Sequence, residues 1–444
     1  MTLALASRRA ALLPGRWVSN ELWRRARAVP SLDLRFAESK SLIDAVSGQQ
    51  LITFSRASGG TFVNSAGQIE IVAENVPRFT HDPVTLESLG LLVEEQRTNS
   101  IRNNTMMGAV AGTPGTFPTN WAAGAAIGFS AEVVGVGSLN GINYIDVRVS
   151  GTAGNTNLAL NLAFESNVIA TTQGQAWTES VWIARVAGST TNINSLSLNL
   201  TERNTSGSNV AFLNGPNILS AINNFERRVY SYSTANASAA FVVPGIWMGH
   251  VGIGSAVDIT LRIGLPQLEQ GAFATSVIPT SGTAVTRNAD VASITGANFS
   301  RWYRQDEGTV FAAYDQPAVG GSIAVVDDGT ANNAIVLFSI SAANQRASSN
   351  MLIASANQGR IDAGGTFVAN ALNKAVLAIS ANGRGLSCNG SAVATSANPS
   401  SMPSLSRLAI QGDSSFSIQK GGHIQRLTYW PQRLPNSTLQ NITL

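Results

Sequence analysis

Apolar and polar residues alternate along several stretches of the chain, a pattern that predicts half-buried strands of antiparallel sheets. In three stretches a Leu, Ile or Phe occupies every second position: 158–164, 196–200 and 259–265. Residues 308–314 and 335–340 predict two further strands. Asn382-Gly383 and Asn389-Gly390 favour tight hairpin turns. Strands that recur with Gly, Asn and Ser turns between them are typical of sandwiches and jelly rolls.

The predicted fold class is all-β, with two antiparallel jelly-roll or β-sandwich domains preceded by a basic N-terminal arm and an extended motif segment. A length of 444 residues has room for about three domains of ~150 residues each. We expect an arm at 1–35, a motif segment at 36–104, a first jelly roll at 105–290 and a second at 291–444. The second jelly roll is expected to fold by itself, and residues 275–290 to form an extended connector before it.

The motif segment contains short extended pieces joined by turns. Ser58-Gly59-Gly60 and Ser65-Ala66-Gly67 supply turn positions, and His81-Asp82-Pro83 sets another turn. Apolar residues between these turns have the spacing of strands rather than of helices. The segment contains no nucleophile–base pair and no cluster of metal ligands.

This segment resembles one found in structural proteins of tailed bacteriophages and phage-like particles. Four groups of residues carry the resemblance: 54–58, 75–79, Asp82-Pro83 and 90–99. The resemblance implies a virion component such as a head fibre or spike or a tail fibre, made in the host cytoplasm and exposed on the released particle. It brings no catalytic residues with it.

Two further resemblances concern the β regions. The closing run at 262–271, followed by 274–280, is similar to the end of carbohydrate-binding-module-like jelly rolls. Residues 422–439 resemble the end of concanavalin/laminin-G-like jelly rolls, although Thr438 replaces an acidic residue of that pattern. These resemblances imply that the β-sandwich domains bind a host-surface glycan.

Composition narrows the possible partners. Charged residues make up 12% of the chain, about half of the ~25% that is typical, so Asn, Ser, Thr, Gly and Gln must cover much of the surface. A net charge of +3 is too small to indicate nucleic-acid binding. No apolar run approaches the length of a membrane span, so we expect no membrane insertion. The single cysteine excludes a disulfide framework, and we expect a homo-oligomer, with a trimer as one candidate, to provide stability.

The basic residues are concentrated near the N-terminus, where residues 17–26 predict a short helix. The candidate attachment residues are Arg8, Arg9, Trp17, Trp23, Arg24 and Arg25. Arg and Trp are enriched at interaction hot spots, so we expect them to dock onto another virion protein, such as the capsid, the portal or adaptor, or the tail. The alternative is a solvated terminus.

A search for catalytic and metal-binding chemistry finds little. The three histidines lie far apart in the sequence, and the neighbours Glu94-Glu95 and Asp327-Asp328 would point to opposite faces of a strand, unlike a glycosidase pair. We therefore expect no catalytic activity and no cofactor. A weak calcium candidate remains, because four residues could supply oxygen ligands: Asp327, Asp328, Asn332 and Asn333. A plain solvated loop is the alternative.

Aromatic residues are the best candidates for glycan contacts, because sugar C–H faces stack on exposed rings. Trp121, Trp302 and Tyr303 lie near predicted turns and are expected at the surface. The function predicted is that of a virion structural protein that binds host glycan. The alternatives are a polysaccharide-depolymerising enzyme of the tailspike type and a purely structural decoration protein.

Overall fold

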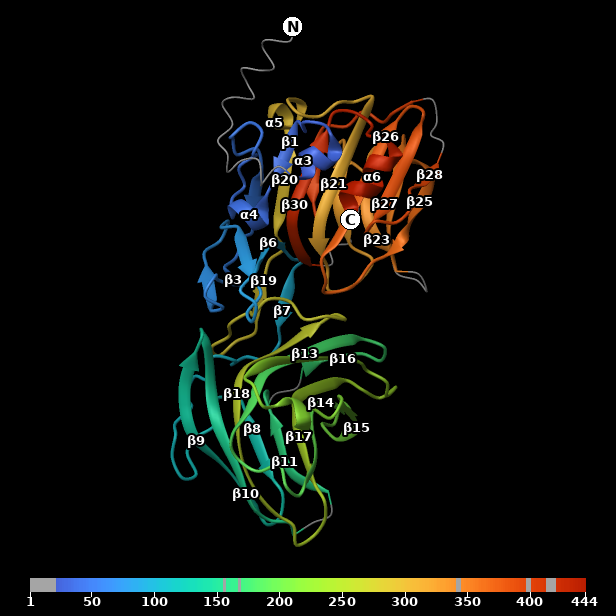
Figure 1. The fold of residues 1–444 in the computed structure, drawn as a ribbon. Coiled ribbons are helices and arrows are strands. Elements are labelled where there is room, and N and C mark those ends of the chain that lie inside the picture. Colours follow the sequence, from blue (N-terminus) through green and yellow to red (C-terminus); the bar gives the residue numbers. More distant parts are fainter. Residues whose placement is uncertain (1–20, 155–156, 167–168, 341–344, 397–400, 413–420) are drawn as a thin grey trace. The chain divides into compact units, whose positions relative to one another are not determined.

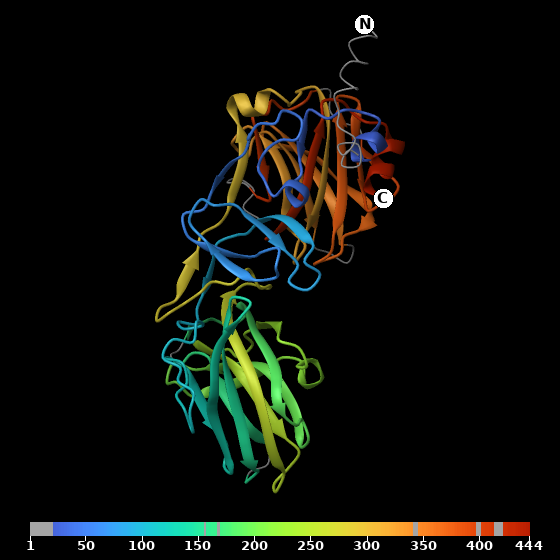
Figure 2. The same ribbon diagram turned by 60° about the vertical axis from the view of Figure 1, so that its left-hand side comes forward.

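The computed structural model describes residues 21–154, 157–166, 169–340, 345–396, 401–412 and 421–444. The fold is all-β and its sheets are antiparallel, as the alternating pattern predicted (Figures 1 and 2). Neither of the two compact units is continuous in sequence. Unit 1 comprises Met1–Ala57, Asn75–Glu95 and Ala289–Leu444, and unit 2 comprises Ser58–Glu74 and Gln96–Asn288. The chain therefore passes between the units four times.

Unit 1 contains an eight-stranded and a seven-stranded sheet. The first has the order β28-β27-β26-β21-β30-β6-β5, with β1 also paired to β30: β28 (Ala394–Ser396), β27 (Gly383–Cys388), β26 (Asn373–Ser380), β21 (Glu307–Asp315), β30 (Gly422–Trp430), β6 (Ser88–Val93), β5 (Arg78–His81) and β1 (Leu32–Leu34). The second has the order β2-β20-β29-β22-β23-β24-β25: β2 (Thr53–Ser55), β20 (Val291–Thr295), β29 (Arg407–Ile410), β22 (Ser322–Asp327), β23 (Ala334–Ile340), β24 (Arg346–Ile353) and β25 (Ala356–Thr366). Their apolar side chains form one large core.

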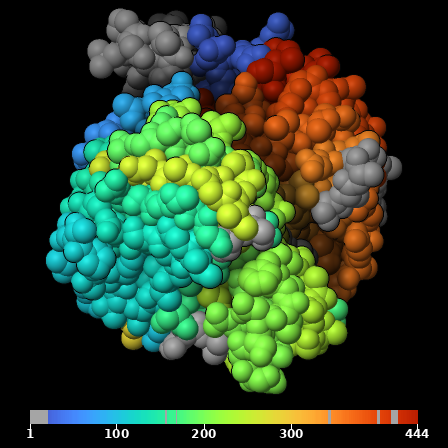
Figure 3. Space-filling model, turned by 90° about the horizontal axis from the view of Figure 1, so that it is seen from below, coloured from blue at the N-terminus to red at the C-terminus, as the bar shows by residue number. Residues whose placement is uncertain are grey.

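Unit 2 contains a five-stranded and a six-stranded sheet around its own core. The five-stranded sheet has the order β16 (Glu226–Ser233), β13 (Ala176–Gly188), β18 (Ala256–Gln270), β10 (Ile142–Thr152) and β9 (Phe129–Leu139). The other has the order β15 (Asn209–Asn214), β14 (Ile193–Arg203), β17 (Phe241–His250), β11 (Leu158–Ala163) and β8 (Ala122–Ala125), with β12 (Ile169–Ala170) paired to β17. The 3-10 helix η1 (Leu219–Ala221) follows β15. Figure 3 shows a face of this unit on which teal, green and yellow segments lie side by side.

Two small strand pairs complete unit 2. The hairpin of β3 (Gly60–Val63) and β4 (Ile69–Val72) comes from the first half of the motif segment. The other pair joins β7 (Arg97–Asn99) to β19 (Val285–Arg287). Residues 275–290 thus lie outside both sandwiches, as expected of a connector, although three of them pair with the motif segment.

The predicted strands are present where the alternation placed them. Leu196, Leu198 and Leu200 on β14 are buried with exposures of 0%, 2% and 0%. The tight turn between β26 and β27 consists of Ala381 and Asn382, one residue earlier than predicted, because Gly383 already pairs with Ser380. Strand β30 pairs with β21, as predicted for the C-terminal region. It also pairs with β6 and β1, which come from the N-terminal part of the chain.

The predicted domain boundaries need correction for that reason. Neither an arm at 1–35 nor a segment at 36–104 is a separate unit, because β1, β2, β5 and β6 are strands of the two sheets of unit 1. Residues 291–444 alone lack these strands. A folding unit limited to that range would leave one hydrogen-bonding edge of β30 and one of β20 unpaired.

The described residues contain four short α-helices: α3 (Glu21–Ala26), α4 (Phe36–Ser39), α5 (Gly296–Ser300) and α6 (Asn436–Thr443). Helix α3 packs against α6, where Leu22 and Ala26 join a cluster with Leu439 and Ile442. The described part of the predicted N-terminal helix, residues 21–26, therefore packs against the rest of unit 1. In the described part of the chain, no helix has the length and apolarity that crossing a bilayer requires.

Candidate functional site

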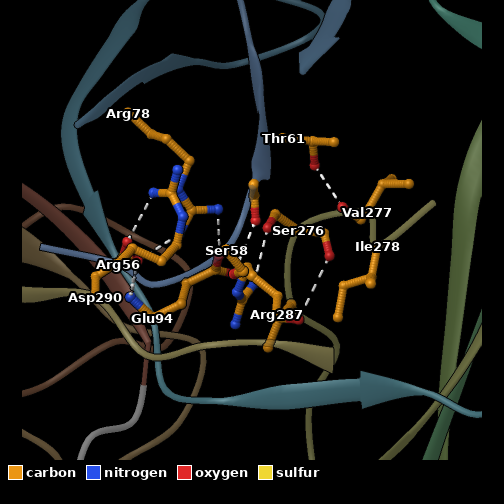
Figure 4. Close-up of polar contacts among 12 residues, drawn as sticks. Arg56, Ser58, Thr61, Arg78, Glu94, Ser276, Val277, Ile278, Arg287 and Asp290 are labelled. Carbon is orange, nitrogen blue, oxygen red and sulfur yellow. Dashed lines mark hydrogen bonds and ion pairs between the residues drawn. The ribbon is translucent and has the colours of Figure 1, made fainter. Parts of the chain in front are cut away.

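Three charged residues of the motif segment form a buried ion network with Asp290 in unit 1 (Figure 4). Arg56 follows β2, Arg78 begins β5, Glu94 follows β6 and Asp290 precedes β20. The Arg56 Nη1 atom lies 3.0 Å from Asp290 Oδ1, and Arg78 Nη1 lies 2.8 Å from Glu94 Oε2. Arg78 also pairs with the second oxygen of Asp290. Two guanidinium groups and two carboxylates therefore balance one another inside the protein.

Burial makes this network sensitive to the loss of any member. Desolvation alone would lower the pKa of Arg78, but Glu94 and Asp290 outweigh it and hold the pKa above its ordinary value. The side chains of Arg56, Arg78 and Asp290 have no exposed area. Removing one partner of a buried pair leaves an uncompensated charge, which costs far more than losing a surface pair.

Backbone contacts hold the same segment in place. The Arg56 N–H donates to Asn75 Oδ1 at 3.0 Å, and the Asn75 N–H donates to the Arg56 carbonyl at 2.9 Å. Asn75 has a φ of 59°, in the left-handed region that asparagine tolerates better than most residues. Arg56 Nη1 also donates to the carbonyl of Val76. The asparagine and the arginine of the motif therefore have structural roles that depend on each other.

In unit 2 the motif residues bind the connector. Thr61 Oγ1 donates to the Val277 carbonyl at 2.6 Å (Figure 4). Within the connector itself, Arg287 Nη1 donates to Ser276 Oγ at 2.9 Å (Figure 4). Asn99 donates through its side chain to the Ile278 carbonyl at 3.1 Å. The segment that carries the phage resemblance is thus used to fix strand connections, and its geometry offers no catalytic constellation among the described residues.

The surface position expected of Trp121 and Trp302 is wrong. Trp121 is 7% exposed, its indole N–H donates to the Asn103 carbonyl at 2.8 Å, and its ring packs on Phe164. Trp302 is 4% exposed and packs edge-on against Phe299. Nearness to a turn did not predict exposure, because each ring points back into a core. Neither ring has a free face for a sugar.

Tyr303 is half-buried in the same aromatic cluster as Trp302. Its ring centre lies 4.6 Å from that of Phe299 and 5.4 Å from that of Tyr429, and burial raises its pKa above the ordinary value. The cavity beside it has a volume of about 20 Å³, enough for a single water at most. A sugar ring does not fit there.

The carboxylates of the calcium candidate have partners inside the chain. Asp327 is fully buried and binds Arg407 through both oxygens at 2.7 Å. Asp328 accepts from the Thr330 hydroxyl at 2.6 Å and from the Asn333 amide at 2.8 Å. Asn332 accepts a hydrogen bond as well, from a serine hydroxyl. Within the described ranges, no three His, Cys, Asp or Glu residues are grouped as metal ligands.

The attachment residues have different positions. Arg8, Arg9 and Trp17 lie outside the described residues. Trp23 is half-buried, donates its indole N–H to Asp33 at 2.9 Å and lies under the Arg35 guanidinium, so it serves unit 1 itself. The remaining two, Arg24 and Arg25, follow it on α3, and no ion pair within the described residues holds them.

A polar cavity in unit 2 was not predicted from the sequence. It has a volume of about 240 Å³ and is lined by Gln96, Arg97, Thr98, Ser100, Trp177 and Gln270. Its residues come from β7 and from the ends of β13 and β18, which lie far apart in the chain. The sequence contained one hint, since four of the six residues belong to or follow the end of the motif segment.

No profile of a known protein family matches the chain, and no curated protein matches it. Solved structures with partial similarity include the tripod of the baseplate of bacteriophage Tuc2009, at 12% identity over 82% of this chain and 98% of that one, with a TM-score of 0.27. The tandem CBM22 domains of Xyn10C from Paenibacillus barcinonensis align at 10% identity over 73% and 98%, with a TM-score of 0.23.

A sialidase from Trypanosoma rangeli also aligns, at 11% identity over 70% of this chain, with a TM-score of 0.27. The aligned part spans only 61% of the sialidase's own length. These similarities include a phage baseplate protein, carbohydrate-binding modules and an enzyme. At such TM-scores none of them carries an argument about function.

Proposed function

We propose that this chain is a structural protein of a tailed phage or phage-like particle, attached through its N-terminal region and binding a host-surface glycan through its β-sandwich units. The observation that carries the proposal is the buried network of Arg56, Arg78, Glu94 and Asp290. Three of these four residues belong to the motif that resembles phage structural proteins. Their role in unit 1 is structural, which agrees with a resemblance that brings no catalytic residues.

The low content of charged residues and the polar cavity of unit 2 support glycan binding. Uncharged amide and hydroxyl groups exchange hydrogen bonds with sugar hydroxyls without the desolvation cost of a charge. Many copies on one particle would give avidity to weak individual sites. We propose a homo-oligomer as the working form and adhesion without bond cleavage as its mechanism.

Two alternatives belong to other classes. A depolymerising enzyme would need two carboxylates across a sugar, and a decoration protein would need no glycan affinity.

Three measurements on the full chain separate these readings. Mass spectrometry of gradient-purified particles tests virion incorporation, a glycan array tests binding, and a reducing-end assay on host capsule tests cleavage. Incorporation and glycan binding without new reducing ends are expected. Absence of the chain from purified particles would overturn the virion proposal, and cleavage abolished by one Asp or Glu substitution would establish the enzyme instead.

A further inference from the structure

The polar cavity of unit 2 has walls that the backbone holds firmly. Trp177 and Gln270 are register partners on neighbouring strands, at the start of β13 and the end of β18. The Ser100 N–H donates to the Leu268 carbonyl at 2.9 Å, which ties the end of the motif segment to β18. The polar side chains of the cavity therefore project from fixed positions.

Three of these side chains have hydrogen-bonding capacity that the protein does not use. In the described part of the chain, no hydrogen bond holds the side chains of Gln96, Ser100 or Gln270, and both glutamines are exposed. Each amide can donate and accept, and so can the serine hydroxyl. Thr98 differs, since its hydroxyl shares a hydrogen bond of 2.8 Å with that of Thr286.

The two remaining lining residues, Arg97 and Trp177, are held in place by contacts inside unit 2. The Arg97 guanidinium lies over the Phe273 ring at 4.8 Å. Gly271, with a φ of 138°, leaves space for that guanidinium, which a Cβ atom would overlap. Trp177 is 4% exposed and its indole N–H donates to Thr171 Oγ1 at 2.9 Å, so this ring only borders the cavity. Recognition of a ligand in the cavity would therefore depend on amide and hydroxyl groups, which exchange hydrogen bonds with hydroxyls.

Size and charge narrow the ligand further. The volume of about 240 Å³ lies below the ~300–1,000 Å³ of pockets that enclose drug-sized ligands, which fits a single ring rather than a long chain. None of the six lining residues is acidic, and Arg97 is the one cation among them. The exposed groups that await partners are uncharged.

We infer that this cavity binds one neutral sugar unit of a glycan, with Gln96, Ser100 and Gln270 on its hydroxyl groups. The inference rests on the proposed glycan binding and names its site and ligand class. The aromatic residues that the sequence favoured have no part in it. The ligand would instead be recognised by amides at the end of the motif segment and of β18.

The test uses the full chain and ligand-observed NMR with methyl galactoside, methyl glucoside, N-acetylglucosamine and rhamnose at millimolar concentration. The Gln96→Ala and Gln270→Ala variants should each weaken binding about five- to tenfold, the effect of one lost hydrogen bond. Gln432→Ala, which removes an exposed glutamine of unit 1, is the matched control and should bind like the natural protein. Thermal midpoints of all variants should agree, because the substituted side chains are exposed.

The possible outcomes distinguish an error in the proposed binding site from an error in the proposed glycan-binding function. If the natural protein binds a neutral sugar and both cavity variants bind equally well, the cavity is not the site while glycan binding stands. If only carboxylated or sulfated glycans bind on an array, the neutral ligand class is overturned. If no glycan binds at all, both this inference and the glycan part of the proposed function fail.

Discussion

Arg56 and Asp290 are 234 positions apart in the sequence and form a salt bridge of 3.0 Å with no exposed area on either side chain. This contact joins the end of β2 to the start of β20, two strands that pair in the same sheet. Residues 36–57 and 75–95 of the motif segment therefore belong to the same compact unit as β20. The network is the point at which the discontinuous segments of unit 1 meet.

Asp290→Ala should destabilise unit 1 by about 3–5 kcal/mol, because Arg56 and Arg78 would both lose their shared carboxylate in a buried position. Calorimetry of the full chain is the measurement, and the transition of unit 1 should move to lower temperature. Asp306→Ala is the matched control, since it breaks an exposed pair with Arg304 in the same unit and should change little. Equal effects of the two substitutions would mean that the network contributes no more than a surface pair.

The N-terminal region should contain two parts with different effects on removal. Deleting residues 2–30 should cost roughly 2–5 kcal/mol, because it removes Leu22, which is buried against α6, whereas deleting 2–20 keeps Leu22 and should avoid that cost. The shorter deletion is thus the cleaner test of attachment through Arg8, Arg9 and Trp17. It should yield stable protein that no longer enters particles. Normal incorporation of that deletion would contradict the attachment role.

Gly90→Ala should be more damaging than an ordinary glycine substitution. Gly90 on β6 has a φ of 88°, and a Cβ atom would overlap the Ile424 carbonyl and lie 2.8 Å from the Gln425 Cα atom. Both β6 and β30 would have to move, which should cost at least about 3 kcal/mol. Gly48 has a similar φ of 71° with nothing near its Cβ position, so Gly48→Ala should cost only about 1 kcal/mol of backbone strain. Comparable melting temperatures of the two variants would refute the steric argument.

The strands could be predicted because their signal is local. A period of two along β14 decides which leucines face the core, and Asn389-Gly390, with a positive φ at both residues, makes the turn that ends β27. The pairing of segments that lie far apart in the sequence has no such local signal. Sequence spacing contains no information on which distant carboxylate an arginine meets, so the pairing of Arg56 with Asp290 could not be anticipated.

The predicted surface positions of the candidate glycan-binding tryptophans were wrong for a related reason. Trp121 follows a turn, yet its ring points inward because the Asn103 carbonyl accepts its N–H there. Exposure depends on which element covers a ring, and this is a tertiary property. The polar cavity joins Gln96 to Gln270 across more than a hundred residues, so no pattern along the chain could predict it.

Removal of calcium should not affect stability. The two oxygens of Asp327 are held by Arg407, and those of Asp328 by Thr330 and Asn333. A chelator should therefore leave the thermal midpoint of the protein unchanged. A midpoint that falls with chelator and is restored by added Ca²⁺ would show that this loop rearranges to bind the ion.

Glu179 on β13 should make unit 2 less stable as the pH rises. It has no exposed area, its Oε2 atom accepts from the Tyr232 hydroxyl at 3.1 Å, and its Oε1 atom has no hydrogen-bond partner. Desolvation raises its pKa well above the ordinary value of 4.5, although the bonds from Tyr232 and the Gly245 backbone oppose the shift. The folded state therefore keeps a proton that the unfolded chain loses.

The sign follows from this difference in bound protons. Below the ordinary pKa both states are protonated and the carboxyl costs nothing, and between the ordinary and the raised pKa the stability of unit 2 falls with increasing pH. Glu179→Gln replaces the neutral acid with an uncharged amide of the same shape, so it should stabilise unit 2 at neutral pH and have little effect in acid. Calorimetric midpoints across a pH series provide the measurement. Tyr232→Phe removes a bond that favours the charged form, so it should raise the pKa further and extend the fall in stability to higher pH. An unchanged pH dependence in both variants would rule out Glu179 as its source.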